Sequence, residues 1–121
     1  MSSLITRLVK KYVASTSPCP IGRAARLMGD RWVLLILREM FVGVTRFDDF
    51  FARTGINRAA LTSRLSKLVQ SGLVERRPVS GRRAQYHLTE AGQALAPTFA
   101  ALRDWGSEWL FADEERPSNF V

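Results

Sequence analysis

The segment from residue 53 to residue 83 concentrates the side chains that could do chemistry with phosphate groups. It carries eight basic residues against one acidic residue, Glu75, whereas residues 84–121 carry two basic and six acidic residues. The whole chain has a formal net charge of +7. A solvated charged face normally mixes the two signs, so a block of one sign indicates a polyanionic partner. Nucleic acid is therefore favoured over an incidental basic surface.

Within this block, residues 57–71 have the pattern of a helix that reads base edges. Its apolar side chains recur at i, i+4, i+7 and i+8, which leaves an outward face of small and polar side chains. Such a face can approach the major groove closely, and its hydroxyls and amides match the donors and acceptors there. An ordinary amphipathic surface helix explains the periodicity equally well, but an arginine-tipped hairpin directly after the helix favours DNA. The expected DNA-binding residues are Asn57, Arg58, Ala59, Thr62, Ser63, Arg64, Ser66, Lys67, Arg76, Arg77, Arg82 and Arg83.

The members of this set are expected to act differently. Sequence preference is assigned to Asn57, Ala59, Thr62, Ser63 and Ser66. Arg58 and Arg64 flank the recognition helix, so phosphate contacts suit them better than base contacts. Arg82 and Arg83 are expected at the hairpin tip, where arginine can enter a narrow minor groove.

The remaining reactive side chains give little basis for an enzyme. His87 is interpreted as a strand residue without a nucleophile nearby, and no nucleotide-binding or zinc-protease motif is present. One cysteine and one histidine cannot make a disulfide within the chain or a recognisable metal site, and no cofactor is expected. A lone cysteine such as Cys19 is more often a buried or tolerated residue than a functional one. Cys19, however, precedes a helix start near Arg23 and Arg26, a setting that favours a reactive thiolate. It is kept as a possible redox sensor for an oxidant or electrophile.

The elements that position these residues follow from periodicity and caps. Helices are expected at residues 4–13, at 21–28 ending at Gly29, at 31–42 capped by Asp30, from about 46 to Gly55, and from Asn57 to Ser71. The last two form a helix-turn-helix. Strands 73–79 and 84–88, joined by residues 80–83, form the wing. Thr89 caps a final helical region, in which Pro97 either kinks the helix or starts a new one.

The predicted fold is therefore mainly α with a small antiparallel β-hairpin, in one domain over residues 1–121. Residues 30–88 form the winged helix-turn-helix, residues 1–28 and 89–111 form dimerisation helices, and residues 112–121 form a flexible tail. The apolar residues left over for a dimer interface are Leu4, Leu8, Tyr12, Leu95, Phe99, Leu102, Trp105 and Trp109. The chain has neither a membrane-spanning run nor a secretory signal pattern, so a cytoplasmic location is expected.

An ordered series of short motifs resembles the HxlR-type regulators of bacteria. It runs from Cys19-Pro20-Ile21 through Gly29-Asp30-Arg31-Trp32, Arg46-Phe47 and Gly72-Leu73-Val74-Glu75-Arg76 to Tyr86-His87-Leu88-Thr89-Glu90-Ala91-Gly92. The resemblance implies a dimeric winged helix-turn-helix whose terminal helices form the dimer. It also implies that the gene is one of those that respond to electrophile, aldehyde or oxidant stress, as the genes of this family often do. In several members the cysteine that matches Cys19 is the sensor.

These observations predict a non-enzymatic, sequence-specific regulator that binds a palindromic operator in double-stranded DNA as a homodimer. It would act as a repressor or as a redox- or electrophile-responsive regulator. Two alternatives remain: a sequence-tolerant nucleoid-type protein that binds DNA or RNA, and an interaction module whose winged helix binds protein.

Overall fold

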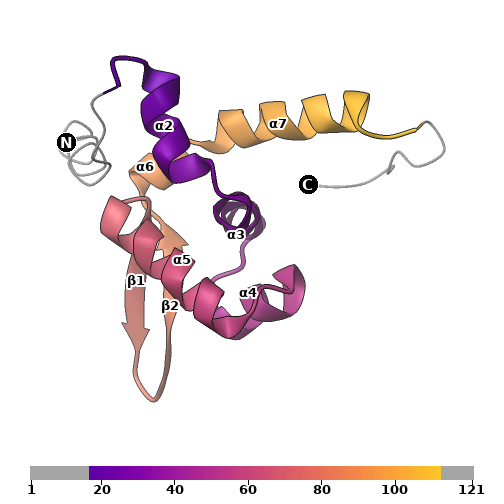
Figure 1. Cartoon of the computed structure of the whole chain (residues 1–121). Helices are drawn as coiled ribbons and strands as arrows, with labels where there is room; N and C mark the ends of the chain where they lie inside the picture. The colour runs from indigo at the N-terminus through magenta and orange to yellow at the C-terminus, as the bar shows by residue number, and fades with distance from the viewer. Residues whose placement is uncertain (1–16, 113–121) are drawn as a thin grey trace.

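The computed structural model describes residues 17–112, in which one two-stranded sheet extends from a group of helices (Figure 1). The predicted helix at 4–13 and all of the predicted tail 112–121 except residue 112 lie outside the described residues. The elements are α2 (Pro20–Met28), α3 (Arg31–Phe41), α4 (Phe47–Thr54), α5 (Arg58–Ser71), β1 (Val74–Val79), β2 (Arg82–Leu88), α6 (Glu90–Gln93) and α7 (Ala96–Trp109). This order confirms the mainly α fold with an antiparallel hairpin.

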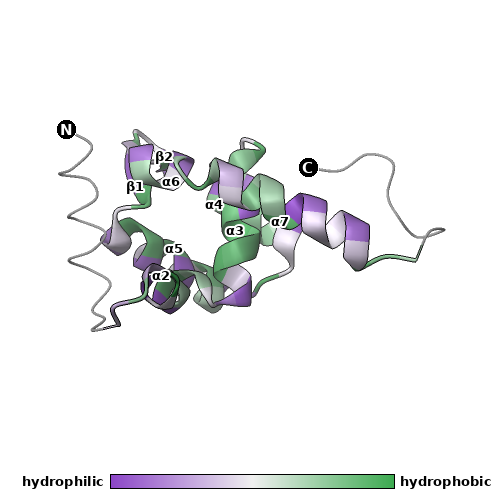
Figure 2. Cartoon of the chain, turned by 90° about the horizontal axis from the view of Figure 1, so that it is seen from above, coloured by the Kyte–Doolittle hydropathy of each residue, from purple (hydrophilic) through white to green (hydrophobic). Residues whose placement is uncertain are grey.

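Helix α3 lies at the centre of the core. Val33, Ile36 and Leu37 are fully buried, and the core continues through Phe50 of α4 and Leu61 of α5. Figure 2 shows α3 as a largely hydrophobic ribbon between the other elements. Asp30 caps α3 as predicted, because its Oδ1 accepts hydrogen bonds from the N–H groups of the first turn. The caps and the apolar stripe therefore fix α3 as the element on which the others pack.

A buried carboxylate joins α3 to α4. Glu39 is almost fully buried, and it accepts hydrogen bonds from Arg38 beside it and from Arg53 of α4. Burial alone would raise the pKa of the Glu39 carboxyl, but the hydrogen bonds and positive charges of the two arginines outweigh it and lower that pKa. The buried charge is thus satisfied by partners from both helices.

The turn between α4 and α5 follows the sequence prediction. Helix α4 ends at Gly55, whose φ of 74° lies in the left-handed region. Asn57 then caps α5, since its side chain accepts a hydrogen bond from the Ala60 N–H at 2.8 Å. Short helices with these caps place α5 across α4 as a helix-turn-helix.

The wing differs from the prediction at its tip. Val79 pairs with Arg82, so the loop is only Ser80 and Gly81, and Gly81 takes a φ of 71°. The predicted four-residue tip was wrong, because β2 already begins at Arg82 and includes Arg83. A register shift lies between Arg77 and Val79, around Pro78, which has no N–H to donate to the ladder.

The chain after the wing is anchored by Thr89. Its Oγ1 donates to the Gly72 carbonyl at 2.6 Å and accepts from the Gly92 N–H, which caps α6 as predicted. Helix α7 then starts anew at its N-terminal Pro97 rather than continuing α6 with a kink. Figure 1 shows α7 projecting away from the remainder of the fold.

Candidate nucleic-acid interface

The predicted recognition face of α5 is exposed along its length. Leu61, Leu65 and Leu68 are buried against the core, which turns the opposite side of the helix to solvent. Ala59, Thr62, Ser63 and Ser66 are all exposed on that side, and Asn57 is exposed at the cap. Lys67 is partly exposed. The face is therefore small, polar and open, as contact with base edges requires.

One aromatic ring brings the wing and the start of α5 together. The Arg58 guanidinium lies 5.9 Å from the Phe47 ring and 4.3 Å from the Phe51 ring, while the Arg83 guanidinium lies 4.7 Å from the Phe47 ring. Arginine stacks well on aromatic faces, and the stacking leaves its donors free at the edge. Two predicted DNA-binding arginines, 25 positions apart in the chain (83 − 58), therefore flank one side chain.

Arg64 of α5 pairs with a residue at the start of α3. Its guanidinium forms an ion pair with Asp30 at 3.1 Å, and both side chains are partly buried. Burial would raise the pKa of the Asp30 carboxyl, but hydrogen bonds from the Val33 backbone and the Arg64 side chain outweigh it and lower that pKa. Arg64 thus holds α5 against the start of α3, a role that the sequence pattern did not indicate.

The wing arginines divide into two groups. Arg77 pairs with Glu75 on β1, so part of its charge is neutralised within the strand. Arg76 and Arg82 are exposed and form no ion pair with a carboxylate among residues 17–112. The sequence pattern indicated one basic cluster, whereas the ion pair with Glu75 distinguishes Arg77 from Arg76 and Arg82.

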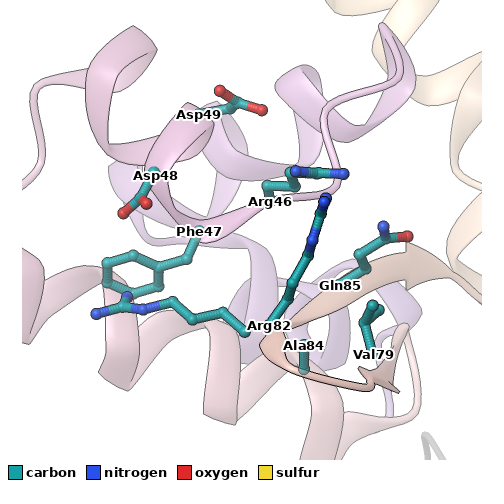
Figure 3. Close-up of a pocket in the computed structure, with 9 residues that line it drawn as sticks. Arg46, Phe47, Asp48, Asp49, Val79, Arg82, Ala84 and Gln85 are labelled. Carbon is teal, nitrogen blue, oxygen red and sulfur yellow. The ribbon is translucent and has the colours of Figure 1, made fainter.

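A cavity of about 620 Å³ opens between the start of α4 and the wing, and its walls carry three arginines: Arg46, Arg82 and Arg83. Arg46 comes from the loop before α4, and its backbone forms an isolated antiparallel bridge to Gln85 of β2. Figure 3 shows the side chain of Arg82 extending toward that of Arg46. Sequence reasoning missed Arg46 because the residue precedes the basic block, and only the bridge to Gln85 brings it to the wing.

Cys19 lies at the N-cap of α2, as its predicted place before a helix start requires, and it is exposed. Its side chain makes no capping hydrogen bond, while its backbone N–H donates to the Ser17 hydroxyl. The Arg23 guanidinium donates to the Ser17 carbonyl at 2.6 Å. The thiol is thus accessible to a small reagent.

The predicted dimer residues fall into three groups. Leu4, Leu8 and Tyr12 lie outside the described residues. Leu95 and Phe99 pack partly against the core, with the Phe99 ring 5.2 Å from that of Phe41. Farther along α7 the apolar side chains are exposed: Leu102, Trp105 and Trp109, together with Leu110 and Phe111 just beyond.

Within residues 17–112, no group of three or more His, Cys, Asp and Glu residues could hold a metal ion. None of the helices in that range is both long enough and apolar enough to cross a membrane.

Comparison with known proteins places these features in a family. A family model for HxlR-like helix-turn-helix proteins matches residues 27–114. An uncharacterised HTH-type transcriptional regulator of Mycobacterium tuberculosis is 48% identical over 99 residues, covering 80% of this chain and 63% of the relative. The chain thus spans less than two thirds of that relative. The regulator YvaP of Bacillus subtilis, also uncharacterised, is 33% identical, covering 76% of this chain and 89% of YvaP.

Solved structures of similar proteins agree with the family match. The crystal structure of PA1607, assigned as a transcription factor, has a TM-score of 0.82 at 37% identity and covers 88% of this chain and 75% of PA1607. The quinone-bound form of YodB from Bacillus subtilis has a TM-score of 0.65 at 33% identity, covering 75% of this chain and all of that chain. The redox regulator HypR in its reduced form has a TM-score of 0.68 at 27% identity, covering 74% of this chain and 92% of HypR.

Proposed function

This chain belongs to the HxlR-like helix-turn-helix family, and on that premise we propose that it is a transcriptional regulator that binds double-stranded DNA as a homodimer. One observation carries the proposal. The exposed polar face of α5 begins beside the same Phe47 ring on which the wing residue Arg83 stacks. A helix for the major groove and a basic hairpin for the neighbouring groove are thereby held in one rigid unit.

The division of labour follows the surroundings of each side chain. Thr62, Ser63 and Ser66 read base edges, since they are small, polar and exposed. Arg58 and the wing arginines bind phosphates or enter the minor groove. Arg64 contributes by positioning α5 through Asp30.

The homodimer is supported by the exposed end of α7. Trp105 and Trp109 are 57% and 70% exposed, and the exposed Leu102, three positions before Trp105, shares their side of the helix by its spacing. A soluble monomer rarely leaves such large apolar side chains together in water. A twofold dimer would present two α5 helices to a palindromic operator, with half-sites about one helical turn apart.

The test is binding to the DNA that flanks the protein's own gene, measured by gel shift against a duplex of unrelated sequence. Preferred, salt-sensitive binding to the flanking DNA is expected. The Thr62→Ala variant should lose about 1–3 kcal/mol of that preference, because one base contact disappears. Thr98→Ala is the matched control, since Thr98 is an exposed threonine on α7.

Two results would favour the alternatives. Equal affinity for every duplex, or preference for single strands, would indicate a nucleoid-type or RNA-binding protein. Unchanged DNA affinity after the double substitution Arg82→Ala and Arg83→Ala would indicate a winged helix that binds protein.

We also propose that Cys19 senses oxidants or electrophiles. The proposal is supported by the exposed thiol at the start of α2 and by the likeness to YodB, whose solved forms include a quinone-bound one. With one cysteine per chain, oxidation can link two subunits or join the sulfur to a small thiol, and a quinone can add to it. DNA binding by Cys19→Ser should resist diamide and quinone, and equal sensitivity of both proteins would refute the role.

A further inference from the structure

We infer that Arg46 and Arg82 together clamp one phosphate of the DNA backbone in the cavity between α4 and the wing. The inference deepens the proposed function and rests on it. The two residues come from different elements: Arg46 is the N-cap of α4, and Arg82 is the first residue of β2. The isolated bridge between Arg46 and Gln85, and the 2.8 Å hydrogen bond from the Tyr86 N–H to the Thr45 carbonyl, hold these elements together.

The two guanidinium groups converge in the same cavity. Arg82 extends along the cavity wall toward Arg46, whereas Asp49 lies on the side of α4 away from Arg82 (Figure 3). Neither arginine pairs with a carboxylate among residues 17–112. Two like charges that face one another repel unless an anion lies between them. The arrangement therefore suits an oxyanion, whose oxygens match the fork of each guanidinium.

Two of the other charged residues that line the cavity have partners of their own, whereas Asp49 forms no ion pair among residues 17–112. Asp48 pairs with Arg58 at 3.5 Å, and Arg83 stacks on Phe47. Arg46 makes no side-chain cap to α4, whose dipole is already complemented by the carboxylates of Asp48 and Asp49 in its first turn. Arg46 and Arg82 are thus the two cations of the cavity that have neither an ion pair nor a ring contact among residues 17–112.

The position of the cavity identifies the source of the phosphate. It lies between α4, the first helix of the helix-turn-helix, and the wing. Helix α5 and the wing would occupy neighbouring grooves of the duplex, and neighbouring grooves are separated by one sugar-phosphate strand. The first helix of such a motif crosses that strand. A backbone phosphate would therefore meet the cavity when both grooves are occupied.

The experiment measures affinity for a fluorescent duplex of mixed sequence over a series of salt concentrations. The proteins are wild type, Arg46→Gln, Arg82→Gln, the double variant, and Arg103→Gln as an exposed α7 control. Each single variant should lose roughly tenfold in affinity, equally for mixed and promoter DNA, because a phosphate contact carries no sequence information. The slope of log affinity against log salt should fall by less than one in each single variant, because the remaining arginine still neutralises the phosphate.

The double variant tests whether the phosphate is shared. If both arginines hold one phosphate, the salt slope of the double variant falls by about one in total. The affinity losses of the two single variants then add up to more than the loss of the double variant. A fall of about two with additive losses would overturn the clamp. Arg46→Lys keeps the charge and should retain the wild-type slope with a smaller affinity loss, which provides a second test if Arg46→Gln folds poorly.

The outcomes separate this inference from the proposed function. If wild type prefers its promoter and Arg46→Gln binds as tightly as wild type, the clamp is refuted and the regulator stands. If inorganic phosphate raises the melting temperature of wild type but not of Arg46→Gln, while their DNA affinities are equal, the cavity binds a free anion instead. If wild type binds all duplexes alike but the variants lose slope as expected, the clamp stands and sequence-specific regulation fails.

Discussion

The carboxylate of Asp30 joins two helices, because one oxygen caps α3 and the other accepts a hydrogen bond from Arg64 of α5 at 3.2 Å. The two residues are 34 positions apart in the chain. The contact fixes the recognition helix against the central helix of the core. Arg64 therefore stabilises the orientation of α5, and it does so from the buried edge of that helix.

Asp30→Ala should lower the free energy of unfolding by about 1–2 kcal/mol, since it removes a helix cap and leaves Arg64 without its partner. Urea denaturation would measure the loss. Asp104→Ala, which removes an exposed carboxylate that pairs with Arg103 on α7, should cost much less. Equal losses in the two variants would contradict the role of Asp30.

The stability of the protein should fall in acid. The pKa values of Asp30 and Glu39 are lowered in the fold from ordinary values of 3.8 and 4.5. A carboxylate with a lowered pKa stabilises the fold above its unfolded pKa, and this contribution is lost as the pH falls through the folded pKa. The urea midpoint should therefore decrease steadily below about pH 5.

Asp30→Asn and Glu39→Gln would identify the carboxylates responsible, because an amide does not titrate in this range. Each variant should be less stable than wild type at neutral pH and should show a shallower decline in acid. An acid profile parallel to that of wild type in both variants would assign the decline to other groups.

Gly92→Ala should destabilise the protein by about 1–3 kcal/mol. A Cβ atom at this position would lie against the Leu73 carbonyl oxygen, at a separation that atoms do not tolerate. Gly106→Ala on α7 is the matched control, because the nearest heavy atom would be a Leu110 methyl at 3.8 Å. That change should stabilise the helix by about 0.5–1 kcal/mol, so thermal melts should shift in opposite directions.

Trp105→Ser combined with Trp109→Ser should convert a dimer to monomers, which sedimentation equilibrium would detect. The expected cause is the loss of apolar area that only a second copy could cover. Affinity for a palindromic site should fall with it, since one α5 helix would bind alone. Val42→Ser, which changes an exposed apolar residue outside α7, should leave the assembly intact. A wild-type protein that is already monomeric at high concentration would refute the α7 interface.

The sequence alone determined most of the secondary structure and the outward face of α5. Helical periodicity assigns Leu61, Leu65 and Leu68 to the core, and their burial leaves the polar residues between them exposed. The caps at Asp30, Asn57 and Thr89 were predictable for the same local reason: each residue bonds to an N–H only two or three positions away. These features depend on neighbours in the chain, which a sequence displays directly.

Only the tertiary structure decided which charged residues meet. Arg64 faces Asp30, Arg83 stacks on Phe47, and Arg46 reaches the wing, and each pair is far apart in the chain. Strand pairing also placed Arg82 and Arg83 in β2 rather than in the loop, because the Val79–Arg82 pair closes the hairpin early. Packing between helices and the geometry of the hairpin turn set these distances, and both depend on contacts between residues that are far apart in the chain or on the local turn, which helical periodicity does not display.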